Sequence, residues 1–405
     1  MPTRLLRFTP QSIFVFCLFA APLGLSGCHK SSFPDVPAGY REYAYVSNGA
    51  SNTVSVLDLV YLRPDRTLQV GLNPSALAVN PVRNEVYVAN AQSGTVSVID
   101  ADANRVAATI WVRRLPRFIA VDASGRRGYV VNAGSNSVSV LDLVSRREIG
   151  LAGTGEEPAV ARLATDGRTL VVSNRGSASV SVYDVQADGA KGAPLRLRST
   201  FAGCPGAGDL AVLPDSSKTF VACTGGHQVM VVSLSAAPGS WAAKQNPSLM
   251  ADRLLTYLDV GTRPEHLAMK PDGGEIFVSN AGSDSVSEIS TWTNEVGGTY
   301  KIGSDPVHGV VSRDNGTLWV SNQGADSVAI YSIDDGKLEG SVHTGSGPGP
   351  LTFSADEHLL LAADAHSGDV AVIRTQGKDG PSLFTLLPAG ARPNAIVTKV
   401  IATKK

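Results

Sequence analysis

Residues 71–100, GLNPSALAVNPVRNEVYVANAQSGTVSVID, contain a pattern that recurs along almost the whole chain. It reads Gly-x-x-Pro, an alternating apolar segment, a turn with Pro, Asp or Gly, an aromatic-Val-x-Asn strand end, a Gly/Ser turn and Val-Ser-Val-x-Asp. Short alternating segments separated by turn residues predict β-strands. The same frame starts again at Arg113, Gly155, Gly203, Gly261, Gly303, Gly345 and Gly390.

Successive starts lie 42, 42, 48, 58, 42, 42 and 45 residues apart. A period in the low forties, with three visible strands and room for a fourth, is that of one four-stranded propeller blade. The last repeat is incomplete, because residues 390–400 supply only one strand, whereas residues 43–59 begin in mid-repeat. We therefore predict an all-β, eight-bladed β-propeller over residues 43–400, closed by its N- and C-terminal strands in one shared blade, blade 1. Seven blades is the alternative, because the repeats that would form blades 5 and 8, which start at Gly203 and Gly345, are degenerate.

The N-terminus has the composition of an export signal. Arg4 and Arg7 precede the apolar run SIFVFCLFAAPLGL, which is short for a membrane-spanning helix. The LSGC that ends it resembles the processing box of bacterial lipoproteins, and an ordinary secreted protein is the alternative. The resemblance implies a signal peptide at residues 1–27 and an acylated Cys28.

From this resemblance we expect a tether over residues 28–42, whereas residues 401–405 form a short tail after the propeller. The implied location is the bacterial cell envelope, lipid-anchored and facing the periplasm, with membrane contact through the lipid only. His29 follows the cysteine where aspartate would favour the inner membrane, so the outer membrane is favoured.

The balance of charge excludes binding through a global electrostatic field. Lys and Arg number 35 and Asp and Glu 36, for a net charge of −1, so we expect no nucleic-acid partner. The protein is expected to be a monomer whose partner is an envelope protein or a small ligand.

Four of the repeats, YVANAQSGTVSVID, YVVNAGSNSVSVLD, FVSNAGSDSVSEIS and WVSNQGADSVAIYS, resemble YVTN-type repeats of bacterial and archaeal surface and periplasmic propellers. The resemblance implies the propeller fold and no particular activity. Most of the repeated polar residues are expected to be structural. The asparagine at the strand end is predicted to hydrogen-bond nearby backbone, and the aspartate of VLD or VID to begin the next hairpin turn. The asparagines are Asn48, Asn90, Asn132, Asn174, Asn280 and Asn322, with Cys223 and Asp364 as exceptions, and the aspartates are Asp58, Asp100 and Asp142.

Function is expected where one blade departs from the others. The second residue after the template proline begins each innermost strand, and in blades 5 to 7 it is Asp209, His266 and His308. These side chains could bind a transition metal, flank a haem-type ligand or act as general acid and base. The alternative is a hydrogen-bonded rim without a ligand, and we expect no cofactor.

Residues 261–283, GTRPEHLAMKPDGGEIFVSNAGS, also resemble the repeat of lactonase-type propellers related to 6-phosphogluconolactonase. His266 lies at the histidine position of that family. Glu265 stands where the family has an arginine, and Ala281 where it often has a glutamate. The resemblance implies hydrolysis of sugar lactones as the enzymatic alternative, with His266, His308 and Asp209 as the candidate catalytic residues.

Blade 3 carries a further departure, RRLPR, at its rim. These arginines could receive a carboxylate, a phosphate or an acidic partner surface. The alternative is a solvated ion-pair patch with Glu156 and Glu157. The residues concerned are Arg113, Arg114 and Arg117, with Arg175 in blade 4.

Two cysteines remain once Cys17 and Cys28 are assigned to the N-terminal segment. Cys204 and Cys223 occupy the positions of Gly71 and Asn90 at one end of a hairpin. A disulfide within blade 5 is therefore predicted, with two buried thiols as the alternative. The long insert of this blade, residues 235–253, is expected between its third and fourth strands. Because the chain shows no complete catalytic motif, we favour a non-enzymatic binding scaffold as its function.

Overall fold

The computed structural model describes residues 36–187, 192–237, 239–240, 244–378 and 380–401. The chain divides into two units, Met1–Asp35 and Val36–Lys405, and all described residues belong to the second. The expected signal peptide, Cys28 and most of the predicted tail lie outside the described residues.

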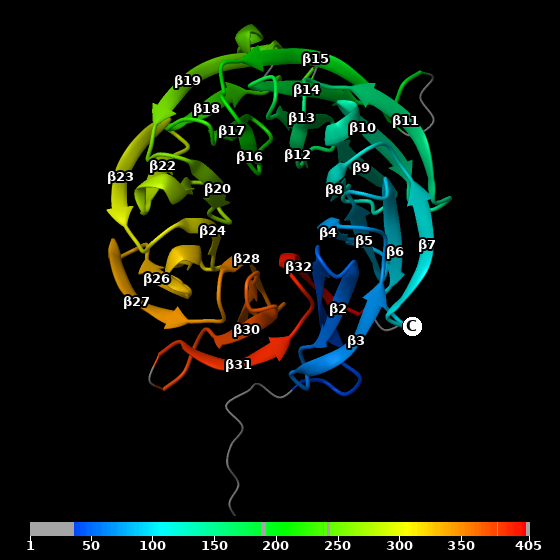
Figure 1. The fold of residues 1–405 in the computed structure, drawn as a ribbon. Coiled ribbons are helices and arrows are strands. Elements are labelled where there is room, and N and C mark those ends of the chain that lie inside the picture. Colours follow the sequence, from blue (N-terminus) through cyan, green and yellow to red (C-terminus); the bar gives the residue numbers. More distant parts are fainter. Residues whose placement is uncertain (1–35, 188–191, 238, 241–243, 379, 402–405) are drawn as a thin grey trace, which may run out of the picture. The chain divides into compact units, whose positions relative to one another are not determined.

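The strands form eight antiparallel four-stranded sheets arranged as the blades of a ring (Figure 1). From the innermost strand outward, blades 1 to 4 are β32 (Pro393–Val400), β1 (Glu42–Asn48), β2 (Thr53–Asp58), β3 (Arg63–Gln69); β4 (Pro74–Val79), β5 (Glu85–Asn90), β6 (Thr95–Asp100), β7 (Arg105–Trp111); β8 (Pro116–Val121), β9 (Arg127–Asn132), β10 (Ser137–Asp142), β11 (Arg147–Gly153); and β12 (Pro158–Leu163), β13 (Thr169–Asn174), β14 (Ser179–Val185), β15 (Leu195–Ala202).

Blades 5 to 8 follow in the same order. They are β16 (Ala207–Val212), β17 (Lys218–Cys223), β18 (Gln228–Ser233), β19 (Arg253–Asp259); β20 (Pro264–Met269), β21 (Glu275–Asn280), β22 (Ser285–Ser290), β23 (Glu295–Lys301); β24 (Pro306–Val311), β25 (Thr317–Asn322), β26 (Ser327–Ser332), β27 (Lys337–His343); and β28 (Pro348–Phe353), β29 (Leu359–Asp364), β30 (Asp369–Arg374), β31 (Ser382–Pro388). Short 3-10 turns are η1 (Ala133–Ser135), η2 (Pro247–Met250), η3 (Ala281–Ser283) and η4 (Gln323–Ala325).

The two ends of the chain complete blade 1. β1 pairs antiparallel with β32, with Glu42 opposite Val400 and Tyr45 opposite Val397. This pairing gives the first blade its innermost strand and leaves no open edge between blades 8 and 2. The predicted eight blades and their closure are confirmed, and the seven-bladed alternative is wrong. The degenerate repeats lost sequence identity but kept short apolar segments between turn residues, and these form four strands in each blade.

The core lies between neighbouring blades. The middle strands are buried along their length, whereas outer strands such as β11 alternate between exposed and half-buried residues. The aromatic residue of the repeat is fully buried, and Tyr129, for example, packs with Ala161 and Leu170 of the next blade. Period-two alternation therefore places one aromatic ring in most of the inter-blade layers.

The repeated asparagines have partners that differ in part from those expected. Their Nδ2 atoms mostly donate to hydroxyl groups of the neighbouring third strand, as Asn90 does to Thr95 and Ser97. A backbone bond to the amide oxygen occurs in blade 1, where Gly390 donates to Asn48. The expected backbone partners thus occur for Asn48 and also for Asn132 and Asn322, but in most blades the serine of Val-Ser-Val supplies a hydroxyl acceptor that was not foreseen.

The repeated aspartates begin the hairpin turns, as predicted. Oδ1 of Asp58 accepts the backbone N–H groups of Val60 and Tyr61, and Oδ1 of Asp142 accepts those of Val144 and Ser145. These bonds tie the turn between the third and fourth strands of a blade to the strand that precedes it.

The ring has two faces that the connections define. The rim face carries the loops into each first strand and the turns after each second strand, for example 112–115 and 133–136. The termini face carries the other turns, for example 80–84 and 143–146, together with Glu42 and Val400 at the two ends of blade 1. The blade 5 insert also leaves from the termini face, between β18 and β19.

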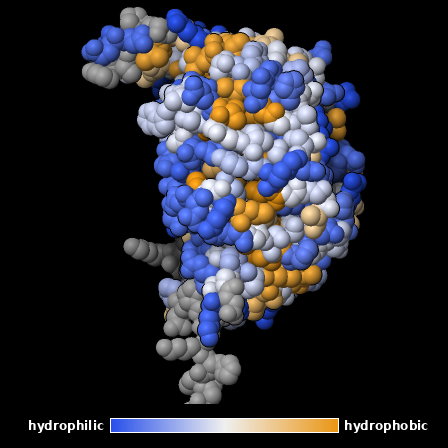
Figure 2. Space-filling model, turned by 90° about the vertical axis from the view of Figure 1, so that its left-hand side faces the viewer, coloured by the Kyte–Doolittle hydropathy of each residue, from blue (hydrophilic) through white to orange (hydrophobic). Residues whose placement is uncertain are grey.

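The outer wall is formed by the fourth strands. Figure 2 shows separate apolar patches among polar side chains on the side of the ring that it presents. Among the residues that the structure describes, no helix is long and apolar enough to cross a membrane.

Candidate functional site

The innermost strands surround the centre of the ring, and part of the space between them is a cavity of about 630 Å³. Its wall is formed mainly by β4, β8, β12, β28 and β32, with His308 from β24. Small apolar residues dominate it, including Ala76, Ala120 and Ala395, and Arg162 and Arg117 supply positive charge. We call this space the channel cavity.

Asp209, His266 and His308 are brought together, as equivalent positions on adjacent strands require. Nε2 of His266 lies 3.5 Å from Oδ2 of Asp209, and the two imidazole rings stack with centroids 3.7 Å apart. All three side chains are largely withdrawn from solvent; that of His266 is 17 % exposed. The cluster faces the centre of the ring at blades 5 to 7.

Each member of this cluster bonds to the backbone of the next blade. The N–H of Gly309 donates to Nδ1 of His266 at 3.3 Å, and the N–H of Leu351 donates to Nδ1 of His308 at 3.4 Å. In the same way the N–H of Leu267 donates to Oδ2 of Asp209 at 3.1 Å. The three side chains therefore connect successive blades, which is a structural role.

These bonds fix the tautomer of both histidines. A nitrogen that accepts an N–H carries no hydrogen, so the hydrogen of each neutral imidazole is on Nε2. Nε2 of His266 then points a hydrogen at Asp209, and Nε2 of His308 is a hydrogen-bond donor. Neither ring offers a lone pair toward the channel.

Burial keeps both rings uncharged. Desolvation lowers the pKa of His266 to about 3, and the Arg162 guanidinium acts in the same direction. Desolvation, followed by the proximity of His266, also holds the pKa of His308 well below its usual value. At neutral pH the pair is therefore a stack of two neutral donors.

A metal ion or a haem-type ligand does not fit this arrangement. A neutral imidazole that ligates through Nε2 needs its hydrogen on Nδ1, where both rings face a backbone N–H instead. Within the described ranges, no three His, Cys, Asp or Glu side chains are grouped so that they could hold a metal ion. The hypothesis of metal or haem ligation by His266 and His308 receives no support from the geometry.

Arg162 is a site residue that the sequence reasoning missed. Its Nη2 atom lies 3.3 Å from Oδ1 of Asp209, its Nε donates to the carbonyl of Leu210, and the guanidinium lies over the Phe118 ring at 5.0 Å. Nη1 has no hydrogen-bond partner among the described residues, and the side chain is 43 % exposed. A signal was available, because Arg162 stands four residues after Pro158, where neighbouring blades have the alanines Ala78, Ala120 and Ala211.

The rim arginines of blade 3 do not form one cluster. Arg113 pairs with Glu148 of its own blade at 2.7 Å, so the expected neutralisation by Glu156 and Glu157 was wrong for this residue. Arg114 and Arg117 have no carboxylate within salt-bridge distance in the part of the chain that the structure describes. Arg117 lines the channel cavity, and Arg114 does not.

Glu265, at the rim of blade 6, has an unusual carboxyl group. Burial raises its pKa, although Arg263 and Arg175 oppose the shift. Its Oε1 lies 3.4 Å from Nε of Arg263. The residue is next to His266 but belongs to the rim rather than to the backbone-bonded cluster.

Blade 5 contains the predicted pair of cysteines in bonding geometry. The sulfur atoms of Cys204 and Cys223 are 2.12 Å apart, and their Cα atoms are 4.8 Å apart. Both side chains are buried beside Val221 and Met230. The disulfide thus occupies the place where other blades have a glycine and an asparagine.

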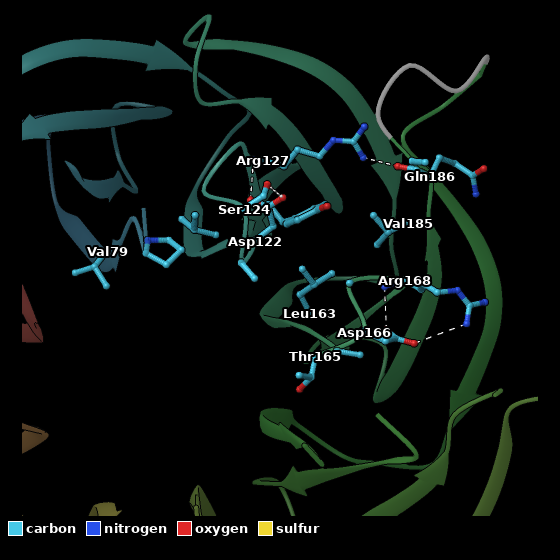
Figure 3. A pocket seen from close by; sticks show the side chains of 17 residues that line it. Val79, Asp122, Ser124, Arg127, Leu163, Thr165, Asp166, Arg168, Val185 and Gln186 are labelled. Atoms are coloured by element: carbon cyan, nitrogen blue, oxygen red, sulfur yellow. Dashed lines mark hydrogen bonds and ion pairs between the residues drawn. The ribbon is translucent and has the colours of Figure 1, made fainter. Parts of the chain in front are cut away.

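A second cavity, of about 730 Å³, opens on the termini face between blades 3 and 4 (Figure 3). Its polar groups already bond to one another. Asp122 accepts the Ser124 hydroxyl and the Arg127 backbone N–H, and Asp166 accepts the backbone N–H of Arg168. We therefore regard the channel cavity, with its partly exposed Arg162 guanidinium, as the better candidate site.

A family model described as "Lactonase, 7-bladed beta-propeller" matches residues 112–248 and 309–385, together just over half of the chain. The ring described above has eight blades rather than the seven of that description. No curated protein sequence matches the chain.

Several solved structures share the fold. They include a dihydro-heme d1 dehydrogenase, NirN, in complex with DHE (15 % identity, TM-score 0.70, covering 90 % of this chain and 76 % of that one), apo AztD from Citrobacter koseri (15 %, 0.64, 90 % and 100 %) and a putative 6-phosphogluconolactonase from Bacteroides fragilis (14 %, 0.59, 91 % and 100 %). At such identities the likeness concerns the fold alone.

Proposed function

The chain belongs to the family described as lactonase, seven-bladed β-propeller, and we propose that it is a binding member of that family, anchored in the cell envelope through Cys28, which takes a small carboxylate ligand in its channel cavity. The apolar run before Cys28 and the LSGC segment support the anchor.

One observation carries the choice of ligand. Arg162 presents a partly exposed guanidinium to a cavity whose wall is mostly alanine, valine and leucine, and its Nη1 has no partner among the described residues. A guanidinium recognises a carboxylate through paired N–H donors. The small apolar residues, with Phe118 under the guanidinium, favour a carboxylate with an apolar body. About 630 Å³ is within the usual range for small-ligand sites.

The same geometry disfavours turnover by the three predicted catalytic residues. A general base needs a free lone pair, whereas Nδ1 of both histidines accepts a backbone N–H. Both oxygens of Asp209 are also engaged, by Arg162 and by Leu267. His308 can donate Nε2–H to a ligand, which is a binding role.

Calorimetric titration with benzoate and with benzamide tests this proposal. We expect benzoate to bind and the uncharged benzamide to bind at least tenfold more weakly, because only the carboxylate uses Arg162. Arg162→Gln should weaken benzoate binding by about tenfold or more, on the order of the 1.5–3 kcal/mol of a charged hydrogen bond, and leave benzamide binding unchanged. Arg66→Gln, which alters an exposed arginine on β3, is the control. Equal binding of both probes, or no effect of Arg162→Gln, would overturn the proposed ligand class.

The anchor is tested separately by growing cells with labelled palmitate. Label should appear in the protein and be absent from Cys28→Ser, which should also leave the membrane fraction. An unlabelled protein would contradict the anchor and leave the ligand proposal standing.

Lactone hydrolysis is the second candidate, and two observations favour it, the family membership and the half-buried Glu265 carboxyl beside Arg263. A carboxyl group with a raised pKa is suited to act as a general acid. If the protein opens δ-gluconolactone and Glu265→Gln abolishes that opening while Glu275→Gln does not, this function replaces the first. No opening above the uncatalysed rate rules it out for this substrate.

A further inference from the structure

The chain enters the ring on the termini face of blade 1. The described residues begin at Val36, whose side chain is 47 % exposed, and β1 starts at Glu42 opposite Val400. The described part of the chain therefore joins the ring on the termini face, and its first residue follows Cys28 by eight positions in the sequence.

Three exposed apolar side chains lie on the termini face of blades 1 to 3. They are in the turns β2–β3, β4–β5 and β10–β11, and the topology places all three turns on that face. The exposed fractions are 70 % for Tyr61, 63 % for Val82 and 63 % for Val144. Scattered exposed apolar residues are ordinary, but three turn tips in consecutive blades beside the chain entrance form a group.

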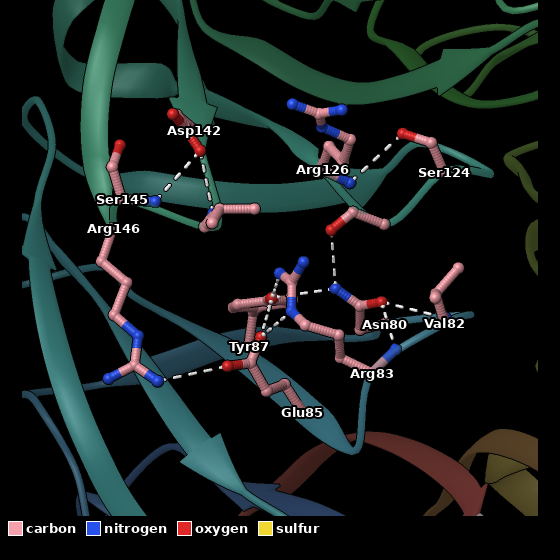
Figure 4. Close-up of polar contacts among 12 residues, drawn as sticks. Asn80, Val82, Arg83, Glu85, Tyr87, Ser124, Arg126, Asp142, Ser145 and Arg146 are labelled. Carbon is pink, nitrogen blue, oxygen red and sulfur yellow. Dashed lines mark hydrogen bonds and ion pairs between the residues drawn. The ribbon is translucent and has the colours of Figure 1, made fainter.

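Three arginines lie in turns of the same face, in blades 2 and 3. Figure 4 shows Arg83 and Arg146 converging on one carboxylate, with Arg126 in the turn of the next blade. Arg83 Nε lies 2.9 Å from one oxygen of Glu85, and Arg146 Nη2 lies 3.2 Å from the other. Tyr87 donates its hydroxyl hydrogen to the same carboxylate. Two guanidinium groups on one carboxylate leave a net positive charge that is held in a fixed place.

The part of the same face that adjoins blade 1 on its other side is mainly acidic. The turns of blades 7 and 8 carry Asp314, Asp334, Asp335, Asp356 and Glu357, against the basic residues Arg313 and Lys378. The turns of blades 1 to 3 carry Arg83, Arg126 and Arg146 against Asp102 and Asp122, so they are weakly basic where those of blades 7 and 8 are acidic.

We propose that the turns of blades 1 to 3 on the termini face dock on an anionic lipid surface. Arginines near such a surface gain attraction from its negative potential, and apolar turn tips gain by entering the interface between headgroups and acyl chains. We call Tyr61, Val82, Val144, Arg83, Arg126 and Arg146 the docking surface. It goes beyond the expectation that the membrane is reached through the lipid alone, and in the cell it rests on the proposed anchor.

This orientation has a consequence for the channel cavity. With the termini face on the lipid, the rim face and its arginines are turned to the aqueous compartment, where a soluble ligand can enter.

Vesicle sedimentation tests the docking surface without the anchor. The chain from His29 onward contains every strand of the ring, since these lie between Glu42 and Val400, and it lacks Cys28. We expect it to sediment with vesicles of phosphatidylethanolamine and phosphatidylglycerol, and not with phosphatidylcholine vesicles. Tyr61→Ser/Val82→Ser/Val144→Ser should weaken the binding by tenfold or more, and so should Arg126→Gln/Arg146→Gln. Raising the salt concentration to 0.5 M should weaken it as well.

Trp292→Ser is the matched control. Trp292 is 84 % exposed in the β22–β23 turn of the same face, but in blade 6, across the ring from blade 2. Its replacement should leave vesicle binding unchanged. A chain that ignores anionic vesicles, or a Trp292→Ser loss as large as that of the triple variant, would overturn the proposal. If the anchor-free chain binds no lipid while the acylated protein stays in the membrane fraction, docking fails and the anchor stands. Binding to an acidic protein in place of the vesicles would likewise overturn it.

Discussion

The imidazole rings of His266 and His308 stack with their centroids 3.7 Å apart and their planes 29° apart, although they come from different blades. Two imidazolium cations at this distance would repel each other strongly in a poorly solvated place. Desolvation lowers the pKa of His266 to about 3 and that of His308 well below its usual value. The stack therefore exists as a neutral pair over the whole neutral range.

This stack predicts that acid destabilises blades 5 to 7. The folded protein resists protonation of His266 down to about pH 3, whereas the unfolded chain takes the proton near pH 6.5. The unfolded state thus binds more protons in this window, so His266 contributes a loss of about 1.4 kcal/mol of unfolding free energy per pH unit as the pH falls below 6.5.

His266→Gln should remove that contribution. Denaturant unfolding at pH 7 and pH 5 should give a difference between variant and parent that changes by about 1–2 kcal/mol, in favour of the variant at the lower pH. His343→Gln, which alters an exposed histidine on β27, should follow the parent. If the variant and the parent keep the same difference at both pH values, the neutral stack is wrong.

A buried acid pair gives blade 8 the opposite dependence. Asp364 is fully buried at the position of the repeated asparagine, and burial, with Asp369 beside it, raises its pKa to about 8. Its folded pKa lies above its unfolded value, so its contribution to stability is complete below about pH 3.8 and is lost as the pH rises toward 8. Between about pH 4 and 6.5 this effect opposes that of the histidines, and only differences between variants separate the two.

Asp364→Asn should therefore stabilise the protein in alkaline solution. The amide can accept from Gly345, as the carboxylate does, and can donate to Asp369 as Asn90 donates to Thr95. At pH 8.5 we expect the variant to gain on the order of 1–3 kcal/mol of unfolding free energy, with no gain at pH 4. Thermal unfolding at the two pH values measures this. Asp356→Asn, in the preceding turn, is the control, and a gain that does not depend on pH would contradict the assigned ionisation.

Much of the fold was predictable because alternation and turn residues are local properties. The repeat at residues 71–100 sets the blade length, and the half-repeats at 43–59 and 390–400 predict the pairing of β1 with β32. The partner of Asn90 was not predictable from propensity. It depends on Ser97, seven residues away on the next strand, and only the strand register brings the two together.

The candidate site was predictable in part for the same reason. Equal positions in adjacent repeats placed Asp209, His266 and His308 together, but their tautomers depend on backbone N–H groups of the following blade. Arg162 was missed because blades were compared only at the second residue after the template proline, whereas Arg162 is the fourth residue after Pro158. Several other blades have alanine at this fourth position, and the difference becomes meaningful only once the inner strand is known to line a cavity.

Asp209 restrains Arg162, and its removal should strengthen ligand binding. Asp209→Asn keeps an oxygen for the N–H of Leu267 but removes the negative charge 3.3 Å from the guanidinium. Under the proposed function we expect benzoate to bind about three- to tenfold more tightly, which corresponds to about 0.7–1.4 kcal/mol. Calorimetric titration measures the change, with Asp215→Asn in the exposed turn of blade 5 as the control. Weaker benzoate binding would show that Asp209 orients Arg162 for the ligand rather than competing with the ligand for it.

Blade 5 has a disulfide where other blades have an asparagine, and the residues around it explain why. Asn90 donates to the hydroxyls five and seven residues later, whereas in blade 5 those positions are Gln228 and Met230. Asn322, which has Ala329 at the second position, donates to a backbone carbonyl instead. An amide in blade 5 would have no hydroxyl partner on the next strand and, like Asn322, would depend on a backbone carbonyl, whereas a disulfide needs no acceptor.

Replacing the disulfide should cost stability, and grafting the asparagine should not restore it. Cys204→Ala/Cys223→Ala should lower the unfolding free energy by about 3 kcal/mol, the usual cost for a loop of this order. Cys204→Gly/Cys223→Asn provides the room that Gly71 gives Asn90 but gives the amide no hydroxyl acceptor, so we expect it to be no more stable than the alanine pair. Denaturant unfolding compares the two variants under oxidising conditions. A graft that proves more stable than the alanine pair would mean that the amide finds a partner in blade 5, and that the hydroxyls of the other blades are dispensable.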